Sequence, residues 1–438
     1  MDHPGHNSTA VLLLAHGTPN TLGEMPEYLS KVTGGRALPP SVVAELQHRY
    51  AQIGLGDTPG TEPPPLTRWT LAQARLLEIA LQQSGHALPV YVAMRNWHPF
   101  IPVVVHQMLA DGVTHILALC LAPQNSSTST GLYRRALTSA LEAEAAQNPS
   151  AAKPSLTFIE SWSDEPALIE AFAQRLIDLY PRACAQSSAQ SLPVLFTAHS
   201  VPCRTIQPNE AGKPSESTSL LSSRSAAEGS ASSPNPYPIE ANPLLSSRSA
   251  AEGSASSPNP YPIEANPLLS SRSAAEGSAF SPNPYPIEAN PLLSSRSAAG
   301  VPGELARWGG AAEGSAFSPD PYPIEAKHTA ELVFASAARR LPNLKKWFFA
   351  FQSQGIAGGP WIGPTVEDTL AAIRAEGHPA VVLQPIGFLS DHVEILYDID
   401  IAFAATARSL GLRLYRTESL NDSPLLTQAL LHVVLGSL

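Results

Sequence analysis

The most chemically capable stretch of the sequence is "PIGFLSDHVEILYDID", which places four carboxylates and one imidazole within ten residues. If the stretch is helical, Glu394 and Asp398 are four residues apart and share one face. Two stacked carboxylates usually indicate a solvated surface, but Ile395, Ile399 and other apolar residues interleave with them, which predicts a largely buried segment. Buried acids beside an imidazole suit Fe²⁺ and other divalent cations, although the spacing matches no standard zinc motif.

A second candidate is His199, which lies in "FTAHSVP" just after a run of apolar residues. Imidazole is the side chain best suited to exchange protons near neutral pH, so His199 could act as a base or contact a metal. A histidine at the end of a strand can equally be a capping or core residue. This stretch alone leaves both interpretations open.

Two further segments carry groups suited to a polar or anionic ligand. "LAPQNSSTSTGLYRRA" offers a run of hydroxyl and amide side chains, including Ser126 and Ser127, ahead of Tyr133 and two arginines. "MRNWHPF" places Arg95 close to Trp97, which is consistent with a flat apolar ligand. Serine-rich loops often only cap helices, so each segment alone is weak support for a binding site.

These candidates follow short apolar runs, which must position them. Eight such runs alternate with helix-length segments, a pattern that predicts repeated β-α-β units. Four runs on each side of a helical passage predict an α/β fold of two Rossmann-like, doubly wound domains with parallel sheets, at residues 8–175 and 190–438. Ligands of such sheets bind beyond the carboxyl ends of the strands. The runs are "AVLLLAHG", "PVYVAMRNW", "HILALCLAP", "LTFIESW", "PVLFTAHS", "KKWFFAFQSQ", "AVVLQPIGF" and "LRLYRTESL".

Residues 209–317 interrupt the second of these domains with a proline- and serine-rich array that repeats every 24 residues. Each unit has almost no aliphatic periodicity, so it cannot bury a continuous apolar stripe and is expected to be disordered. The last copy differs, because "DPYPIEAKHTAELV" continues into a predicted helix. We interpret the array as a tandem duplication whose original ends at Ala326. The alternative is a binding module for proline-recognising partners.

Composition and charge exclude several other functions. The net charge of −10 argues against a nucleic-acid partner. The three cysteines are widely spaced, which fits a reducing compartment and offers neither a thiolate zinc site nor a four-cysteine iron–sulfur cluster. No apolar run reaches the roughly 18 residues of a membrane span, and the start of the chain lacks the basic region of a signal peptide. The expected location is the cytoplasm.

Taken together, the motifs resemble those of the ferrochelatase family. The resemblance covers essentially the whole chain outside the array, and a dozen motifs in the family's order are far more specific than any one of them. They include "LLLAHGTP", "YLSKVTGGR", "HRYAQIG", "MRNWHPFI", "LAPQNSSTSTGLYRRA", "AHSVP", "DPYPIEAKHTAELV", "FQSQG", "PWIGPTVEDTL" and "PIGFLSDHVEILYDIDI".

The resemblance implies a lyase that inserts ferrous iron into a porphyrin, late in haem biosynthesis, with the macrocycle in the cleft between two Rossmann-like domains. It assigns His199 as the base and a metal contact, with Glu394 facing it across the cleft. Asp398 continues the metal-binding row, on a helix with a π-type bulge. Ferrous iron is then a substrate, and no tightly bound cofactor or iron–sulfur cluster is expected. The implied porphyrin contacts are His16, Arg36, Arg95, Ser126, Ser127 and Tyr133.

Some positions depart from the family's pattern. The third carboxylate, one turn beyond Asp398, is replaced by Ala402, so the metal path is shorter or uses Asp400. The tyrosine that often follows "GTP" is Asn20, which leaves the metal contact on the opposite face open between Asn20 and His16. "KVTGGR" is most similar to the soluble, monomeric bacterial type that uses coproporphyrin. We therefore expect a monomer that converts coproporphyrin III, with protoporphyrin IX as the second candidate.

Two alternatives remain open from the sequence. One is another chelatase of the same architecture, which loads cobalt or nickel into a different tetrapyrrole. Its signature would be a second histidine in place of Glu394, which this chain lacks. The other is a tetrapyrrole carrier that has lost catalysis, although His199 and Glu394 are both intact.

Overall fold

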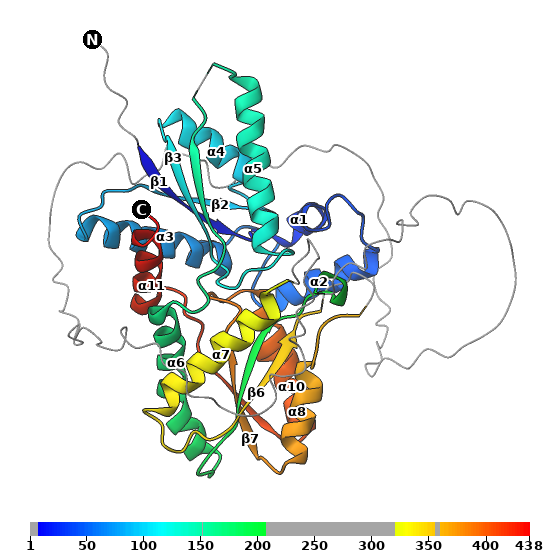
Figure 1. Cartoon of the computed structure of the whole chain (residues 1–438). Helices are drawn as coiled ribbons and strands as arrows, with labels where there is room; N and C mark the ends of the chain where they lie inside the picture. Colours follow the sequence, from blue (N-terminus) through cyan, green and yellow to red (C-terminus); the bar gives the residue numbers. More distant parts are fainter. Residues whose placement is uncertain (1–7, 151, 207–319, 355–359) are drawn as a thin grey trace, which may run out of the picture. The chain divides into compact units, whose positions relative to one another are not determined.

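The eight apolar runs form the strands of two parallel sheets, which confirms the predicted fold class (Figure 1). The computed structural model describes residues 8–150, 152–206, 320–354 and 360–438. The predicted repeat insertion, at 209–317, lies outside the described residues, and the helix predicted after it is present. The domain boundaries stay predictions.

The first sheet has the strand order β2-β1-β3-β4. Strand β1 is buried on both faces, because alternate residues enter two different apolar clusters. Helices α3 (Pro65–Gln83) and α6 (Pro166–Gln186) cover one face, and α4 (Ile101–Ala110) and α5 (Thr130–Gln147) cover the other. The strands are β1 (Thr9–Ala15), β2 (Val90–Met94), β3 (His115–Cys120) and β4 (Ser155–Ile159).

The second sheet repeats this arrangement with the order β6-β5-β7-β8. Helices α6 and α7 (Tyr322–Ala338) pack on one face. The other face carries α8 (Val366–Ala375), the short helix α9 (Val393–Leu396), the π-helix η5 (Asp398–Phe403) and α10 (Ala404–Ser409). The strands are β5 (Val194–His199), β6 (Trp347–Gln352), β7 (Ala380–Pro385) and β8 (Arg413–Arg416).

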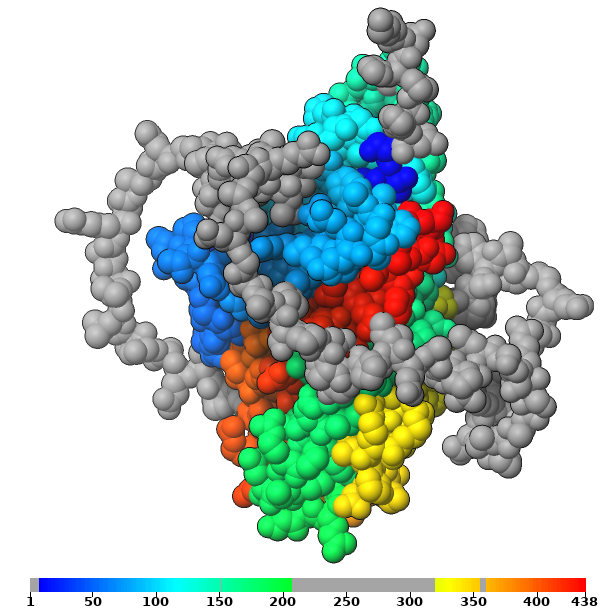
Figure 2. Space-filling view, turned by 90° about the vertical axis from the view of Figure 1, so that its left-hand side faces the viewer, coloured from blue at the N-terminus to red at the C-terminus, as the bar shows by residue number. Residues whose placement is uncertain are grey.

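The remaining elements connect the two sheets. Helix α11 (Pro424–Leu435) packs on α3 and α6, and Figure 2 shows the red C-terminal surface directly against the blue surface that contains α3. Residues from both sheets therefore share one apolar core. A smaller cluster, which includes Trp97 and is contacted by Val393, is built by α1 (Met25–Val32) and α2 (Pro40–Gln52). Short turns η1 (Leu22–Glu24) and η2 (Cys203–Thr205) complete the described structure.

In the described part of the chain, none of the helices combines the length and the apolar character that crossing a lipid bilayer requires.

Candidate active site

His199 and Glu394 come together as a close pair. His199 is the last residue of β5, and Glu394 lies in the first turn of α9. The distance between His199 Nε2 and Glu394 Oε1 is 3.3 Å. On its other side, the His199 ring contacts the carbonyl oxygen of Ser200 through Nδ1. With Nδ1 donating to that carbonyl, a contact between Nε2 and a carboxylate requires a proton on Nε2 as well.

The charges of this pair stabilise each other. Burial alone would lower the pKa of His199, but the charge and hydrogen bond of Glu394, together with the Ser200 carbonyl and the Asp398 charge, outweigh burial and raise that pKa. Burial would likewise raise the pKa of Glu394, but the neighbouring imidazoles of His199 and His392 hold it well below its ordinary value. The pair is therefore an imidazolium next to a carboxylate.

His392 completes a row of three groups, because its Nε2 lies 3.3 Å from Glu394 Oε2. Its Nδ1 lies 2.9 Å from the carbonyl oxygen of Ser390, which fixes the ring. Glu394 is thus held between two imidazoles, one from each side. The sequence placed His392 in the acidic stretch but gave it no role, because nothing in its spacing shows that it turns back towards Glu394.

Asp398 lies at the start of the π-helix that the family resemblance implied. Its Oδ2 accepts a hydrogen bond of 2.5 Å from the Ser353 hydroxyl, and its Oδ1 lies 3.7 Å from Arg49 Nη1. Burial is the main cause that raises the pKa of Asp398, and the Glu394 charge adds to it. The two carboxylates are therefore close enough for the charge of Glu394 to raise the pKa of Asp398.

The other acids of the stretch point elsewhere. Both carboxylate oxygens of Asp400 bind Arg416, at 2.5 Å from Nε and 2.9 Å from Nη2. Asp391 lies 3.6 Å from the same guanidinium and accepts bonds from Ser419 and Asn421. The four acids therefore fall into two pairs. Glu394 contacts His199 and Asp398 contacts Ser353, whereas Asp391 and Asp400 neutralise Arg416.

His16 belongs to the same charged region, although it comes from the first sheet, directly after β1. Burial is the main cause that lowers the pKa of His16 to about 4, and the charges of Arg95, His392 and His199 contribute to this value against the opposing effect of Glu394. The amide nitrogen of Asn96 lies 3.0 Å from its Nε2 and 3.2 Å from its Nδ1. The ring is neutral at physiological pH.

The predicted porphyrin contacts divide into two groups. Arg95 follows β2 with its guanidinium 5.8 Å from the centre of the Tyr133 ring, and its Nε is buried without a hydrogen-bond partner among the described residues. Arg36 is exposed beyond α1. By contrast, the Ser127 hydroxyl and amide donate to Asp320 Oδ2 at 2.7 and 2.9 Å, and Ser126 Oγ lies 3.3 Å from the same oxygen. A porphyrin contact of either serine stays a prediction.

A pocket of about 430 Å³ adjoins this region. His392 and Val393 line one side of it, and Asn20 and Tyr50 line another. The rest is formed by the proline-rich loop at 53–66 and by Thr18 and Arg68. His392 therefore contacts Glu394 and also borders this pocket.

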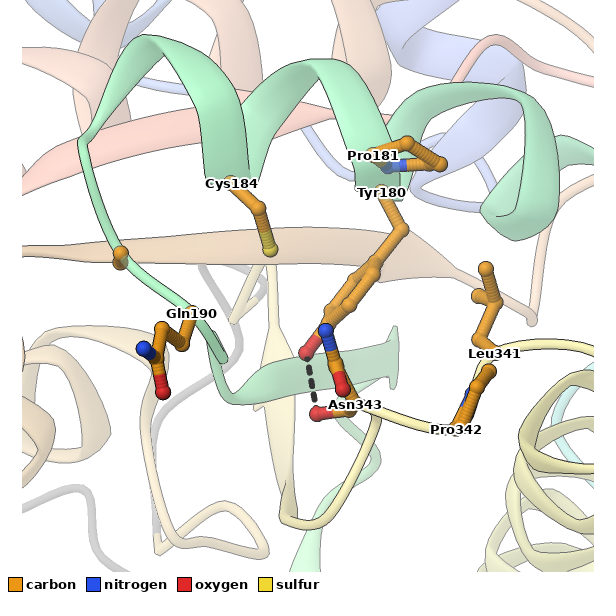
Figure 3. A pocket seen from close by; sticks show the side chains of 8 residues that line it. Tyr180, Pro181, Cys184, Gln190, Leu341, Pro342 and Asn343 are labelled. Carbon is orange, nitrogen blue, oxygen red and sulfur yellow. Dashed lines mark hydrogen bonds between the residues drawn. The ribbon is translucent and has the colours of Figure 1, made fainter.

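A second pocket, of about 280 Å³, lies at the opposite end of the second sheet (Figure 3). It is lined by Tyr180, Cys184, Asn343 and neighbouring residues, close to the residues that enter β5 and β6. The single hydroxyl proton of Tyr180 is directed between the carbonyl oxygens of Leu192 and Asn343, which lie 2.9 and 3.1 Å from its oxygen. Since β5 separates this pocket from His199 by about 20 Å, it plays no part in the candidate site.

No three His, Cys, Asp or Glu side chains among the described residues are grouped closely enough to hold a metal ion by themselves. The predicted metal contacts His199, Glu394 and Asp398 therefore do not form a complete ligand set by themselves. A cation at this site would need further donors from another molecule.

Comparisons with known proteins point to one family. The family model described as ferrochelatase matches residues 8–237 and 298–438. A protein of Acidobacterium capsulatum named ferrochelatase is 41% identical over 421 residues, which cover 96% of this chain and 92% of the relative. A ferrochelatase of Herpetosiphon aurantiacus is 30% identical and covers 98% of both chains. A coproporphyrin III ferrochelatase of Geobacillus thermodenitrificans is 24% identical over 98% of this chain and 96% of its own.

Proposed function

Because the chain belongs to the ferrochelatase family, whose enzymes insert iron into porphyrins for haem synthesis, we propose that it takes coproporphyrin III in preference to protoporphyrin IX. The observation that carries this preference is the state of two arginines: Arg95, which lies beside Tyr133 and His16, and Arg36, which is exposed after α1. Neither Arg36 nor Arg95 forms an ion pair with another residue of the described ranges. Coproporphyrin III carries four propionates and protoporphyrin IX carries two, so free guanidinium groups favour the former.

We propose that His199 removes the pyrrole protons. Insertion exchanges two N–H protons of the macrocycle for one Fe²⁺, and the protons leave to solvent. In the resting pair His199 already holds a proton on Nε2, stabilised by Glu394. The approach of a dication next to Glu394 favours loss of that proton, which leaves Nε2 free to accept a proton from a pyrrole nitrogen. His392, on the far side of Glu394, borders the pocket through which the protons can leave.

We propose that Glu394 and Asp398 guide ferrous iron to the macrocycle. Carboxylates and imidazoles suit Fe²⁺, and the four porphyrin nitrogens supply the donors that the incomplete protein set lacks. An incomplete set also fits a substrate ion that must leave the protein within the product. The reaction forms metal–nitrogen bonds without hydrolysis or redox change, so we class the enzyme as a lyase. A monomeric state and a cytoplasmic location stay predictions.

The porphyrin preference can be tested on the arginines. We expect Arg95→Gln and Arg36→Gln to raise the KM for coproporphyrin III about tenfold, and to change the KM for protoporphyrin IX less, because a lost charge-assisted bond is worth about 1.4 kcal/mol or more. Arg340→Gln is the control, since Arg340 is an arginine paired with Glu170. Equal effects on both porphyrins would show that these arginines do not select between them.

A further inference from the structure

Two consecutive residues at the carboxyl end of β6 form hydrogen bonds to the segment that carries Glu394 and Asp398. Gln352 is the last residue of β6, and its side-chain amide donates a hydrogen bond of 2.9 Å to the main-chain carbonyl of Glu394. Ser353 follows, and its hydroxyl donates to the carboxylate of Asp398. These two neighbouring residues thus bind α9 through the Glu394 carbonyl and the π-helix through the Asp398 side chain.

Gln352 also holds the other member of the pair. In the parallel register of β5 and β6, His199 lies directly opposite Gln352. The main-chain carbonyl of Gln352 accepts a bond of 2.7 Å from the amide of Ser200, the residue after His199. The main chain of Gln352 therefore fixes the end of β5, while its side chain fixes the turn of Glu394. Gln352 therefore bonds to both segments whose side chains form the pair of His199 and Glu394.

The bonds also have a defined direction. The Gln352 amide nitrogen lies 3.4 Å from Ser353 Oγ, to which it can donate, so the single hydroxyl proton of Ser353 is directed to Asp398. The side chain of Gln352 is buried, and its Oε1 has no hydrogen-bond partner among the described residues. Packing alone does not favour a buried amide with one unpaired oxygen, because a methionine would fill similar space at no such cost.

The backbone at Ser353 supports the same interpretation. Its φ is +61°, in the left-handed region that residues with a Cβ atom rarely adopt. A glycine would adopt this conformation more easily, but it has no hydroxyl group to offer Asp398. Strained backbone of this kind is typical of sites where the side chain has a task.

We infer that Gln352 and Ser353 are positioning residues for iron insertion: Gln352 sets the distance between His199 and Glu394, and Ser353 orients Asp398 towards the incoming cation. The inference rests on the proposed roles of Glu394 and Asp398. Neither residue needs to touch the substrates, because each acts through the carboxylate segment. Partners of this kind change metal affinity or activity by about 10- to 100-fold in other metal sites.

The test compares initial rates of ferrous iron insertion under anaerobic conditions, with both substrates varied. Gln352→Met keeps the volume and removes the donor, and we expect kcat to fall about tenfold while the KM for porphyrin stays unchanged. Gln384→Met is the matched control, because Gln384 is equally buried, on strand β7 of the same sheet, and no hydrogen bond joins it to Glu394 or Asp398 within the described residues. Equal rates for these two variants would overturn the role of Gln352.

For Ser353, the comparison of two small residues separates the hydroxyl from the backbone. We expect Ser353→Ala and Ser353→Gly to raise the KM for Fe²⁺ alike, by about tenfold, although glycine should be the more stable of the two. Ser353→Asn, which tolerates positive φ and keeps a donor, should restore part of the affinity. Recovery of the normal KM by Ser353→Gly would contradict the role of the hydroxyl.

Glu394→Gln in the same assay distinguishes this inference from the function on which it rests. An inactive Glu394→Gln beside a fully active Gln352→Met would overturn the positioning role alone. An active Glu394→Gln would overturn both, because the residue being positioned would then be unnecessary.

Discussion

At the scale of single residues, the site is a row of three groups in which Glu394 lies between His199 and His392. Each imidazole stabilises the carboxylate, and the carboxylate strengthens His199 as a proton acceptor. A basic group of this kind, beside an acid that can attract a dication, suits the exchange of protons for iron. The first predictions concern these residues.

We expect His199→Ala to abolish iron insertion, by at least about 100-fold in kcat, while porphyrin still binds. The side chain supplies the proton acceptor, whereas the walls of the cleft come from other residues. Anaerobic rates and porphyrin absorption titrations measure the two properties separately. Turnover close to that of the wild type would remove His199 from the mechanism.

Glu394→Gln should impair kcat by about 100-fold or more, and Asp400→Asn by less than about threefold. The difference follows from their partners, because Glu394 contacts His199 whereas Asp400 is bound to Arg416 on both oxygens. Asp400→Asn should instead cost about 1 kcal/mol of unfolding free energy, measured in urea. The reverse order of the two rates would show that iron follows Asp400.

Acid should destabilise the protein partly through His16. Its pKa is about 4 in the folded protein and 6.5 when unpaired, so the unfolded chain binds a proton more readily between these values. The stability that depends on a neutral His16 is complete above pH 6.5 and is lost as the pH falls towards 4. The ring is partly exposed, so we expect a loss of about 1 to 2 kcal/mol from pH 7.5 to 5.

Urea unfolding of the wild type and of His16→Gln at these two pH values measures that contribution. The variant should lose less stability on acidification than the wild type does. An identical loss in both proteins would mean that His16 is not held neutral by its surroundings.

Much of the site could be predicted from the sequence at this scale. His199, Glu394 and Asp398 were identified by their residue types at the ends of predicted strands and by resemblance to a family. The partners that orient them were not, because the bond from Gln352 to Glu394 spans 42 residues and leaves no local pattern. The sequence likewise did not show that Glu394 contacts His199 while Asp400 binds Arg416. That difference depends on the position of β8, which ends at Arg416.

At the scale of elements, all eight strands were predictable, because each corresponds to a short apolar run, and the inner strands β1, β3, β5 and β7 are buried on both faces. The π-helix was expected only through the family resemblance, since the sequence around Asp398 has no periodicity that distinguishes it from an α-helix. The start of α7 was less predictable. It is held by Asp320, which binds the serine loop before α5 and also accepts a bond from the amide of Tyr322.

We expect Asp320→Ala to lower the unfolding free energy by about 2 to 4 kcal/mol, because Asp320 is buried and its loss leaves the Ser127 amide and two hydroxyls without their acceptor. Asp320→Asn, which copies the asparagine found at this place in the three earlier repeats, should cost about 1 to 2 kcal/mol. Urea unfolding measures both, with Glu331→Ala on the exposed face of α7 as the control. Losses no larger than that of the control would mean that α7 is held by its apolar face alone.

At the scale of the whole molecule, the site depends on both sheets. The carboxyl ends of β1 and β2 carry His16 and Arg95, and those of β5, β6 and β7 lead to His199, Gln352 and the acidic stretch. Gln73 on α3 joins the halves through hydrogen bonds to Ser390 and to the carbonyl of Asn421, 2.8 and 2.7 Å long. The residues assigned to the site all lie within 8–206 and 320–438, so the chemistry proposed here does not require the repeat array.

The most direct measurement is the anaerobic initial rate of ferrous iron insertion into coproporphyrin III and into protoporphyrin IX, followed by the porphyrin absorption bands. Our account predicts insertion into both, with the higher kcat/KM for coproporphyrin III. A higher kcat/KM for protoporphyrin IX would contradict the proposed preference, and no insertion into either porphyrin would contradict the proposed function itself.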